Sequence, residues 1–149
     1  MSANDEVLLG SNRILIKDDV LTWICGPVVR VQDTEAGHAI FSSQHDKYGY
    51  VLVLGDIRQL VALPAEIRRL HSEWHRRYNP HFSVALFGGS FVARALVQLV
   101  FRAAELIQGK GLMQFKWSDS ESQAIAWLDS ERIRLRQKLP GAAKKYPPP

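Results

Sequence analysis

Three polar residues follow the apolar run of residues 50–54, which has the composition of a buried strand. They are Asp56, Arg58 and Gln59. In parallel sheets, ligands bind near the carboxyl ends of strands, so these side chains could form a polar binding edge. The alternative is that Asp56 stabilises the turn after the strand and pairs locally, a common role of Asp.

A second candidate is the sequence Gly88-Gly89-Ser90, which follows the expected strand 82–87 and opens a helix. Backbone N–H groups at a helix N-terminus can hold an anion. Ser90 also resembles the nucleophile of a G-x-S-x-G elbow, but Val92 stands where the last glycine belongs. No acid/base pair accompanies it, so the pattern favours an N-cap over a hydrolase serine, and we expect no catalytic residues.

His71 and His75 stand four residues apart, so on one helix they would share a face and could hold a metal. The H-E-x-x-H pattern is absent because Ser72 follows His71, and no third ligand stands nearby. We therefore expect solvent-facing rings, no metal site and no cofactor. Cys25 has no local His partner and is expected to be a packed thiol.

The segment 91–107 is apolar on more than one side. Its polar stripe is narrow and consists of Arg94, Gln98, Arg102 and Glu105. The apolar residues are Phe91, Val92, Ala95, Leu96, Val97, Leu99, Val100, Phe101, Leu106 and Ile107. A surface helix normally has an apolar stripe of only about 100°. Three explanations stay open: burial under the N-terminal strands or the last helix, a homodimer seam, or the wall of an apolar ligand cavity.

The positions of these candidate residues depend on a predicted fold of alternating strands and helices. Periodicity and turn residues predict strands at 13–17, 21–25, 50–54, 82–87 and 113–117. Helices are expected at 33–46, where Gly37 weakens the pattern, from Pro64 to 78, from 91 to 108, and after a cap at Ser118 or Ser120. The order β-β-α-β-α-β-α-β-α predicts an α/β fold whose five-stranded mixed sheet is mostly parallel, with about four helices. We expect a flexible N-terminus at 1–11, one domain at 12–138 and a disordered Pro/Lys-rich tail at 139–149.

Composition narrows the classes of function. The 149 residues suit one domain, and a single cysteine suits a reducing compartment, so we expect a cytoplasmic protein without a signal peptide or membrane span. The net charge is +4, but residues 131–145 hold six basic groups and one acid. The remaining residues hold 13 basic and 14 acidic groups, a net of −1, so we expect no nucleic-acid partner.

Three segments carry a resemblance to a known family: residues 50–74 (YVLVLGDIRQLVALPAEIRRLHSEW), 87–100 (FGGSFVARALVQLV) and 113–128 (MQFKWSDSESQAIAWL). Over roughly residues 12–136 the chain resembles the STAS family of anti-sigma-factor antagonists, in its SpoIIAA-like or STAS/Sec14-like branch. Classical members switch through a phosphorylatable Ser after the central strand. Here residues 60–65 (LVALPA) contain no Ser or Thr, so that switch is not carried over.

The resemblance implies a regulatory module that binds a protein partner rather than an enzyme. We expect a homodimer through the 91–107 helix, with a carrier of a small apolar or lipid-like ligand as the alternative and a Ser90 hydrolase as a remote third. The candidate binding residues are Asp56, Arg58, Gln59, Pro64, Gly88, Gly89, Ser90, Arg94, Gln98 and Phe101.

Overall fold

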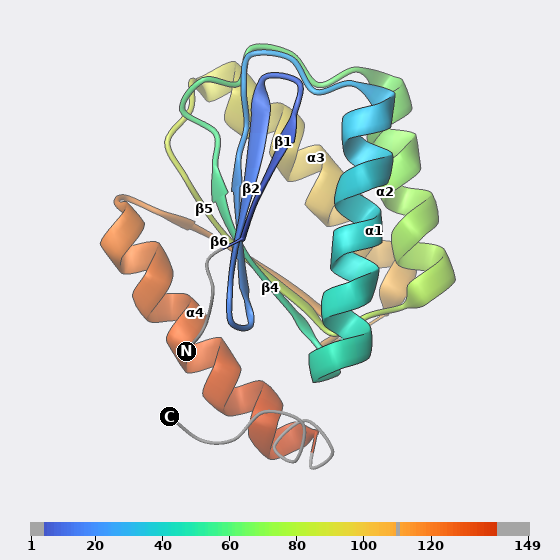
Figure 1. Ribbon diagram of the computed structural model, residues 1–149, viewed down its shortest axis with the longest axis vertical. Coiled ribbons are helices and arrows are strands. Elements are labelled where there is room, and N and C mark those ends of the chain that lie inside the picture. The colour runs from blue at the N-terminus through green and yellow to red at the C-terminus, as the bar shows by residue number, and fades with distance from the viewer. Residues whose placement is uncertain (1–4, 110, 140–149) are drawn as a thin grey trace.

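The computed structural model describes residues 5–109 and 111–139, which form one sheet and four helices (Figure 1). The strands are β1 (Asp5–Leu9), β2 (Asn12–Lys17), β3 (Val20–Ile24), β4 (Val51–Asp56), β5 (Phe82–Phe87) and β6 (Met113–Ser118). The helices are α1 (Val31–Tyr48), α2 (Ala65–Tyr78), α3 (Phe91–Gln108) and α4 (Glu121–Lys138).

The sheet has the strand order β1-β2-β3-β4-β5-β6. Strands β1 to β3 pair antiparallel, and β3 to β6 pair parallel, as crossover helices require. Figure 1 shows α1, α2 and α3 on one face of the sheet and α4 on the other. The expected mixed, mostly parallel α/β sheet is confirmed.

The two central strands are buried along their whole length because helices cover both faces. Alternate residues of β4 enter different cores. Val51 and Val53 belong to the cluster under α1 to α3, whereas Leu52 and Leu54 belong to the cluster under α4. This period of two explains why β4 reads as a continuous apolar run.

The sheet has six strands rather than the expected five, because Asp5–Leu9 pairs antiparallel with β2 through a turn at Gly10. The expectation that residues 1–11 are loose is therefore wrong for this part. Residues 5 and 6 are acidic and only Val7–Leu9 are apolar, too short a run for periodicity to identify. The expected disordered tail falls on 139–149, of which only Leu139 lies within the described residues.

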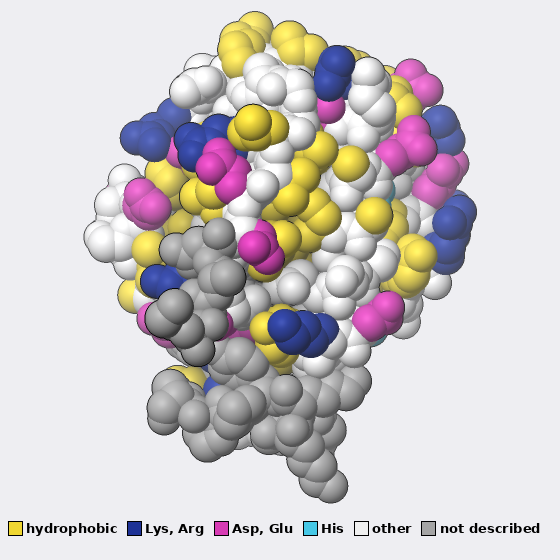
Figure 2. Space-filling view, viewed as in Figure 1, with side chains coloured by type: hydrophobic (Ala, Val, Ile, Leu, Met, Phe, Trp, Pro, Cys, Tyr) yellow, Lys and Arg dark blue, Asp and Glu magenta, His cyan; other side chains and the backbone are white. Residues whose placement is uncertain are grey.

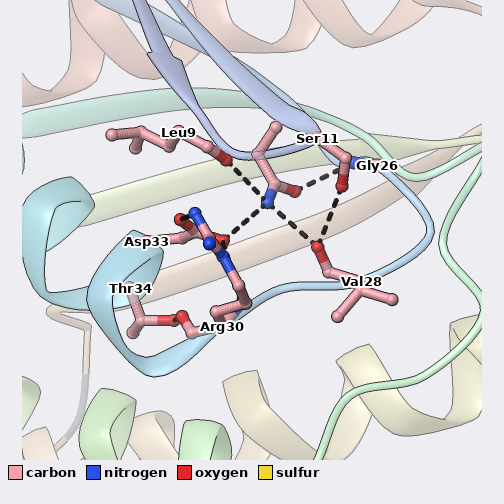
Figure 3. A network of polar contacts seen from close by, with 8 residues as sticks. Leu9, Ser11, Gly26, Val28, Arg30, Asp33 and Thr34 are labelled. Carbon is pink, nitrogen blue, oxygen red and sulfur yellow. Dashed lines mark hydrogen bonds and ion pairs between the residues drawn. The ribbon is translucent and has the colours of Figure 1, made fainter.

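A buried polar network fastens this hairpin to the start of α1 (Figure 3). Asn12 is fully buried, and its amide nitrogen donates to Leu9 O, Val28 O and Asp33 Oδ2 at 3.1–3.2 Å. Its side-chain oxygen accepts from Gly26 N at 2.9 Å. The polar atoms of the Asn12 side chain are thus hydrogen-bonded to backbone groups and to Asp33. These bonds fix the β1–β2 turn against the loop between β3 and α1.

The N-terminus of α1 differs from the expected cap at Asp33 or Thr34. The N-cap is Arg30, and Asp33 at the third helical position accepts from Arg30 N at 3.0 Å and from the Arg30 guanidinium at 2.8–3.0 Å. Only a glycine fits at position 37, because a Cβ there would lie 2.4 Å from the Trp23 ring. The glycine that weakened the sequence pattern lets α1 approach the sheet closely.

Among the described residues, no helix combines the length and the apolar character needed to cross a bilayer. The last helix packs on the sheet through Ala124, Leu128 and Leu135, and Ser120 caps it by accepting from Gln123 N. Of the two expected caps, Ser120 is therefore the correct one.

Candidate functional site

The sequence-predicted polar edge lies where β4 and β5 end. Asp56 is the last residue of β4, is 6% exposed, and accepts hydrogen bonds from the Arg58 backbone N (3.1 Å), Nε (3.0 Å) and Nη2 (2.8 Å). Burial alone would raise the pKa of Asp56, but the Arg58 hydrogen bonds outweigh burial and hold the pKa below its ordinary value. The carboxylate is therefore engaged in its own turn.

The glycine pair Gly88-Gly89 lets the loop after β5 pack closely against the loop after β4. A Cβ on Gly88 would lie 2.3 Å from Arg58 Cγ, and one on Gly89 would lie 2.8 Å from Ile57 Cδ1. Both glycines have positive φ angles, of 80° and 84°, which residues other than glycine rarely adopt. Arg94 Nε donates to Gly88 O at 3.0 Å and fixes the same loop to α3.

Ser90 is the N-cap of α3, and its side-chain oxygen accepts from Ala93 N at 3.1 Å. This geometry supports the capping interpretation. The structure brings Asp56, Arg58, Gly88, Gly89, Ser90 and Arg94 together. It leaves Gln59 exposed, and Pro64 is the exposed N-cap residue of α2 instead of lying in its first turn. The polar groups at this edge hydrogen-bond to one another and to the loop backbone, so a local structural role accounts for their presence.

The two most exposed large apolar side chains of the described residues lie on α3, and Leu99 on the same helix is also exposed. Phe91 is 87% exposed, Leu106 is 85% exposed and Leu99 is 55% exposed. The opposite side of the helix, with Ala93, Val97, Val100 and Ala104, is buried on the sheet and α2. In the described part of the chain, neither the N-terminal strands nor the last helix covers this exposed side of α3.

A shallow groove runs between α3 and the edge strand β6. It is lined by Phe91, Arg94, Ala95, Gln98, Leu99, Arg102 and Trp117. Two arginines lie over aromatic rings of β6: the Arg94 guanidinium carbon is 4.9 Å from the centre of the Trp117 ring, and that of Arg102 is 5.9 Å from Phe115. Cation–π contacts of this kind hold the guanidinium groups against the sheet edge.

Phe101 does not belong to this groove. Its ring lies 6.0 Å from the Phe115 ring, packs against the core and lines an internal cavity. The binding residues predicted from the sequence do not include Trp117, Leu99 or Leu106. Trp117 comes from a different strand, and periodicity within α3 could not place it, whereas the two leucines were visible as apolar positions on an over-apolar helix.

The cavity lies between the sheet and helices α1 to α3 and has a volume of about 70 Å³. Its walls are apolar, with Trp23, Phe41, Val53, Phe82 and Val97 among them, and it is touched by Cys25 and His71. Burial, and to a lesser extent the charge of Asp56, raises the pKa of the Cys25 thiol to about 12. The thiol is therefore protonated and unreactive at neutral pH, as expected of a packed cysteine.

The histidines of α2 are not free solvent-facing rings, which corrects the sequence expectation: His75 is buried, and the half-buried His71 contacts α1. His75 is fully buried, and its Nδ1 contacts Gln108 Oε1. His71 Nδ1 lies 2.9 Å from His38 Nε2, and the His38 ring stacks on Trp74 with centroids 5.4 Å apart. The polar flank of α2 misled the prediction, because the partners on α1 and α3 are far away in sequence.

These histidines are held neutral. Burial, with the charge of His75 as a smaller cause, lowers the pKa of His38 to about 3, and burial lowers the pKa of His75 to about 4. Within the described residues, no three His, Cys, Asp or Glu side chains converge in a way that could hold a metal ion. The rings form part of an aromatic layer between α1, α2 and β5.

Charged groups of both signs are interspersed on the face that carries the β1–β2 hairpin, with hydrophobic side chains between them (Figure 2). Three basic residues of α4 have acidic partners: Arg132 pairs with Asp19 and Asp129, Arg134 pairs with Glu131, and Arg136 pairs with Asp19. Part of the basic excess at the end of the chain is therefore used within the fold.

The comparison with solved structures supports this architecture. No family model and no curated protein matches the chain. Among solved structures it is similar to an uncharacterised protein of the DUF3478 family with a SpoIIAA-like fold, from Shewanella loihica. The TM-score is 0.55 at 17% sequence identity, over 85% of this chain and 93% of that one. The chain has a SpoIIAA-like fold, the fold of STAS domains, as the sequence resemblance implied. A fold alone does not assign a function.

Proposed function

We propose that this chain is a regulatory, STAS-type protein-interaction module without enzymatic activity, which acts in the cytoplasm and self-associates through α3. One observation carries the proposal: Phe91, Leu99 and Leu106 project from one helix at 87%, 55% and 85% exposure. Exposed apolar patches of this kind on a small domain mark interaction sites. Burial of such side chains in a dimer contributes about 25 cal/mol for each Å² of apolar surface removed from water, and the entropy lost on association offsets part of this gain.

The groups that could have carried catalysis support a binding role instead. Asp56 is engaged by Arg58, and Ser90 by the first turn of α3. The loop between β4 and α2, residues 57–64, has no Ser or Thr, so a phosphorylation switch at that place has no acceptor. The exposed apolar side chains of α3 favour regulation through association with another protein chain.

The test is the mass in solution measured by size-exclusion chromatography with light scattering. We expect a dimer for the unmodified chain and a monomer for Leu106→Glu, because a charge would be buried at the seam. The matched control is Ile133→Glu on α4, a residue that is also exposed and apolar but lies away from the groove. A monomer for all three proteins, or equal masses for both variants, would contradict the proposal.

The second candidate is a carrier of a small apolar ligand, favoured by the apolar cavity under α1 to α3. Its volume of about 70 Å³ is small. An apolar cavity that holds benzene measures roughly 150 Å³. Native mass spectrometry of the purified chain would reveal a retained ligand, and a spectrum of ligand-free protein would remove this candidate.

A further inference from the structure

The exposed stripe of α3 is symmetric about its own midpoint. Phe91 and Leu106 lie equally far from the point between Gln98 and Leu99, and so do Ala95 and Arg102. At about 100° per residue, these six side chains project within about 50° of one line along the helix. Phe91, Ala95, Leu99, Arg102 and Leu106 are exposed, and Gln98 is half-buried. A stripe with this symmetry meets an identical stripe in register when the second helix runs in the opposite direction.

We infer that two copies of this chain pack their α3 helices antiparallel, about a twofold axis that passes between Gln98 and Leu99. Phe91 then contacts the partner's Leu106, at both ends of a seam roughly 22 Å long. This inference rests on the proposed self-association and adds its partner, direction and register. The occupant of the groove is a second copy because the surface complements itself.

The centre of the seam favours the antiparallel direction. In a parallel pair with the same register, Arg102 would face the partner's Arg102, and the two like charges would repel. In the antiparallel pair, Arg102 faces the small side chain of the partner's Ala95. Its guanidinium can stay over the Phe115 ring, where it already lies. The antiparallel direction also opposes the two helix dipoles, which parallel packing would align.

Charge complementarity along the flank of the stripe agrees with this register. Arg94 and Glu105 project from the same side of the stripe, roughly 90° and 70° from its centre line. They are about 16 Å apart along their own helix, too far to pair within one chain. The antiparallel register places Arg94 about 3 Å along the axis from the partner's Glu105. Glu105 is exposed and has no ion-pair partner in the part of the chain that the structure describes.

Disulfide cross-linking tests the register, because it requires side chains that already lie close together. We expect Leu99→Cys, next to the axis, to cross-link with itself under mild oxidation. Phe91→Cys alone and Leu106→Cys alone should stay unlinked, whereas a mixture of the two should form a cross-linked heterodimer. The unmodified chain is the control, since its partly buried Cys25 thiol packs against the core and should give no dimer band.

The outcomes separate the register from the proposed function. If light scattering shows a dimer but Phe91→Cys cross-links with itself, or no variant cross-links, the antiparallel register is wrong and self-association stands. If every protein is monomeric, both fail. An independent readout is Glu105→Arg, which should raise the dimer dissociation constant about tenfold by reversing two charge pairs. Glu35→Arg, an exposed acid of α1, should leave it unchanged.

Discussion

Arg132 holds the carboxylate of Asp19 with two hydrogen bonds, from Nε to Oδ2 at 2.8 Å and from Nη2 to Oδ1 at 2.9 Å. The two residues are 113 positions apart, and Asp19 is 2% exposed in the turn between β2 and β3. Tyr50 Oη also donates to Asp19, at 2.6 Å. This pairing joins α4 to the turn between the antiparallel strands β2 and β3.

Loss of this ion pair should destabilise the fold. We expect Arg132→Met to lower the free energy of unfolding by about 2–3 kcal/mol, because the buried carboxylate of Asp19 loses the nearer of its two arginine partners, Arg132 and Arg136. Urea denaturation followed by circular dichroism measures the change. Arg13→Met is the matched control, since its partner Glu6 is exposed and such pairs contribute less than about 1 kcal/mol. Equal effects of the two substitutions would show that Arg132 does not anchor α4.

The cap of α3 gives a second prediction. Ser90→Ala should lower the free energy of unfolding by about 1 kcal/mol, because Ala93 N loses its acceptor. Ser90→Asp should keep stability within about 0.5 kcal/mol, since a carboxylate also caps and favours the helix N-terminus. If the two variants were equally unstable in thermal denaturation, the hydroxyl would have a role other than capping.

The glycine inside α1 gives a third prediction. Gly37→Ala raises helix propensity by about 1 kcal/mol, but the added Cβ would lie 2.4 Å from the Trp23 ring. We expect a net destabilisation of about 1–2 kcal/mol, because the core is too tightly packed to move freely. Ser43→Ala, at an exposed position of the same helix, reports propensity alone and should stabilise slightly. A more stable Gly37→Ala variant would contradict the close approach of α1 to β3.

The buried histidines predict that the protein loses stability in acid. The pKa values of His38 and His75 in the folded chain are about 3 and about 4, below the ordinary value of 6.5. Between these values the unfolded state binds more protons, so the free energy of unfolding falls as pH decreases from 6.5 towards 4. Each ring should contribute roughly 1–2 kcal/mol of loss between pH 6.5 and 5.

Urea midpoints measured at several pH values test this prediction. His75→Gln removes one titrating ring, so its stability should depend less steeply on pH in this range than that of the unmodified chain. A midpoint that stays constant between pH 7 and 5 would show that the rings are not held neutral by burial.

The sequence predicted most elements because local signals agreed with the fold. Residues 82–87 read as a strand on composition, and Gly109 ended α3 where a helix terminator was expected. Strand β1 was missed because an acidic, five-residue edge strand has little pattern of its own. Gly37 counted against α1 because the reason for the glycine, Trp23, lies on another element.

The functional site was predicted only in part. The excess of apolar residues on α3 was visible in the sequence, and exposure of Phe91 and Leu106 follows that expectation. Asp56 and Ser90 have the types of residue that catalysis uses, but their partners, Arg58 and Ala93, give each a local structural role. Trp117 joined the groove through tertiary structure, which no spacing within α3 could indicate.

Sedimentation equilibrium of the unmodified chain is the decisive test of self-association through α3. We expect a weight-average mass that rises with concentration from 16.9 kDa towards twice that value and fits a monomer–dimer equilibrium. A mass that stays at 16.9 kDa at every concentration would contradict self-association through α3.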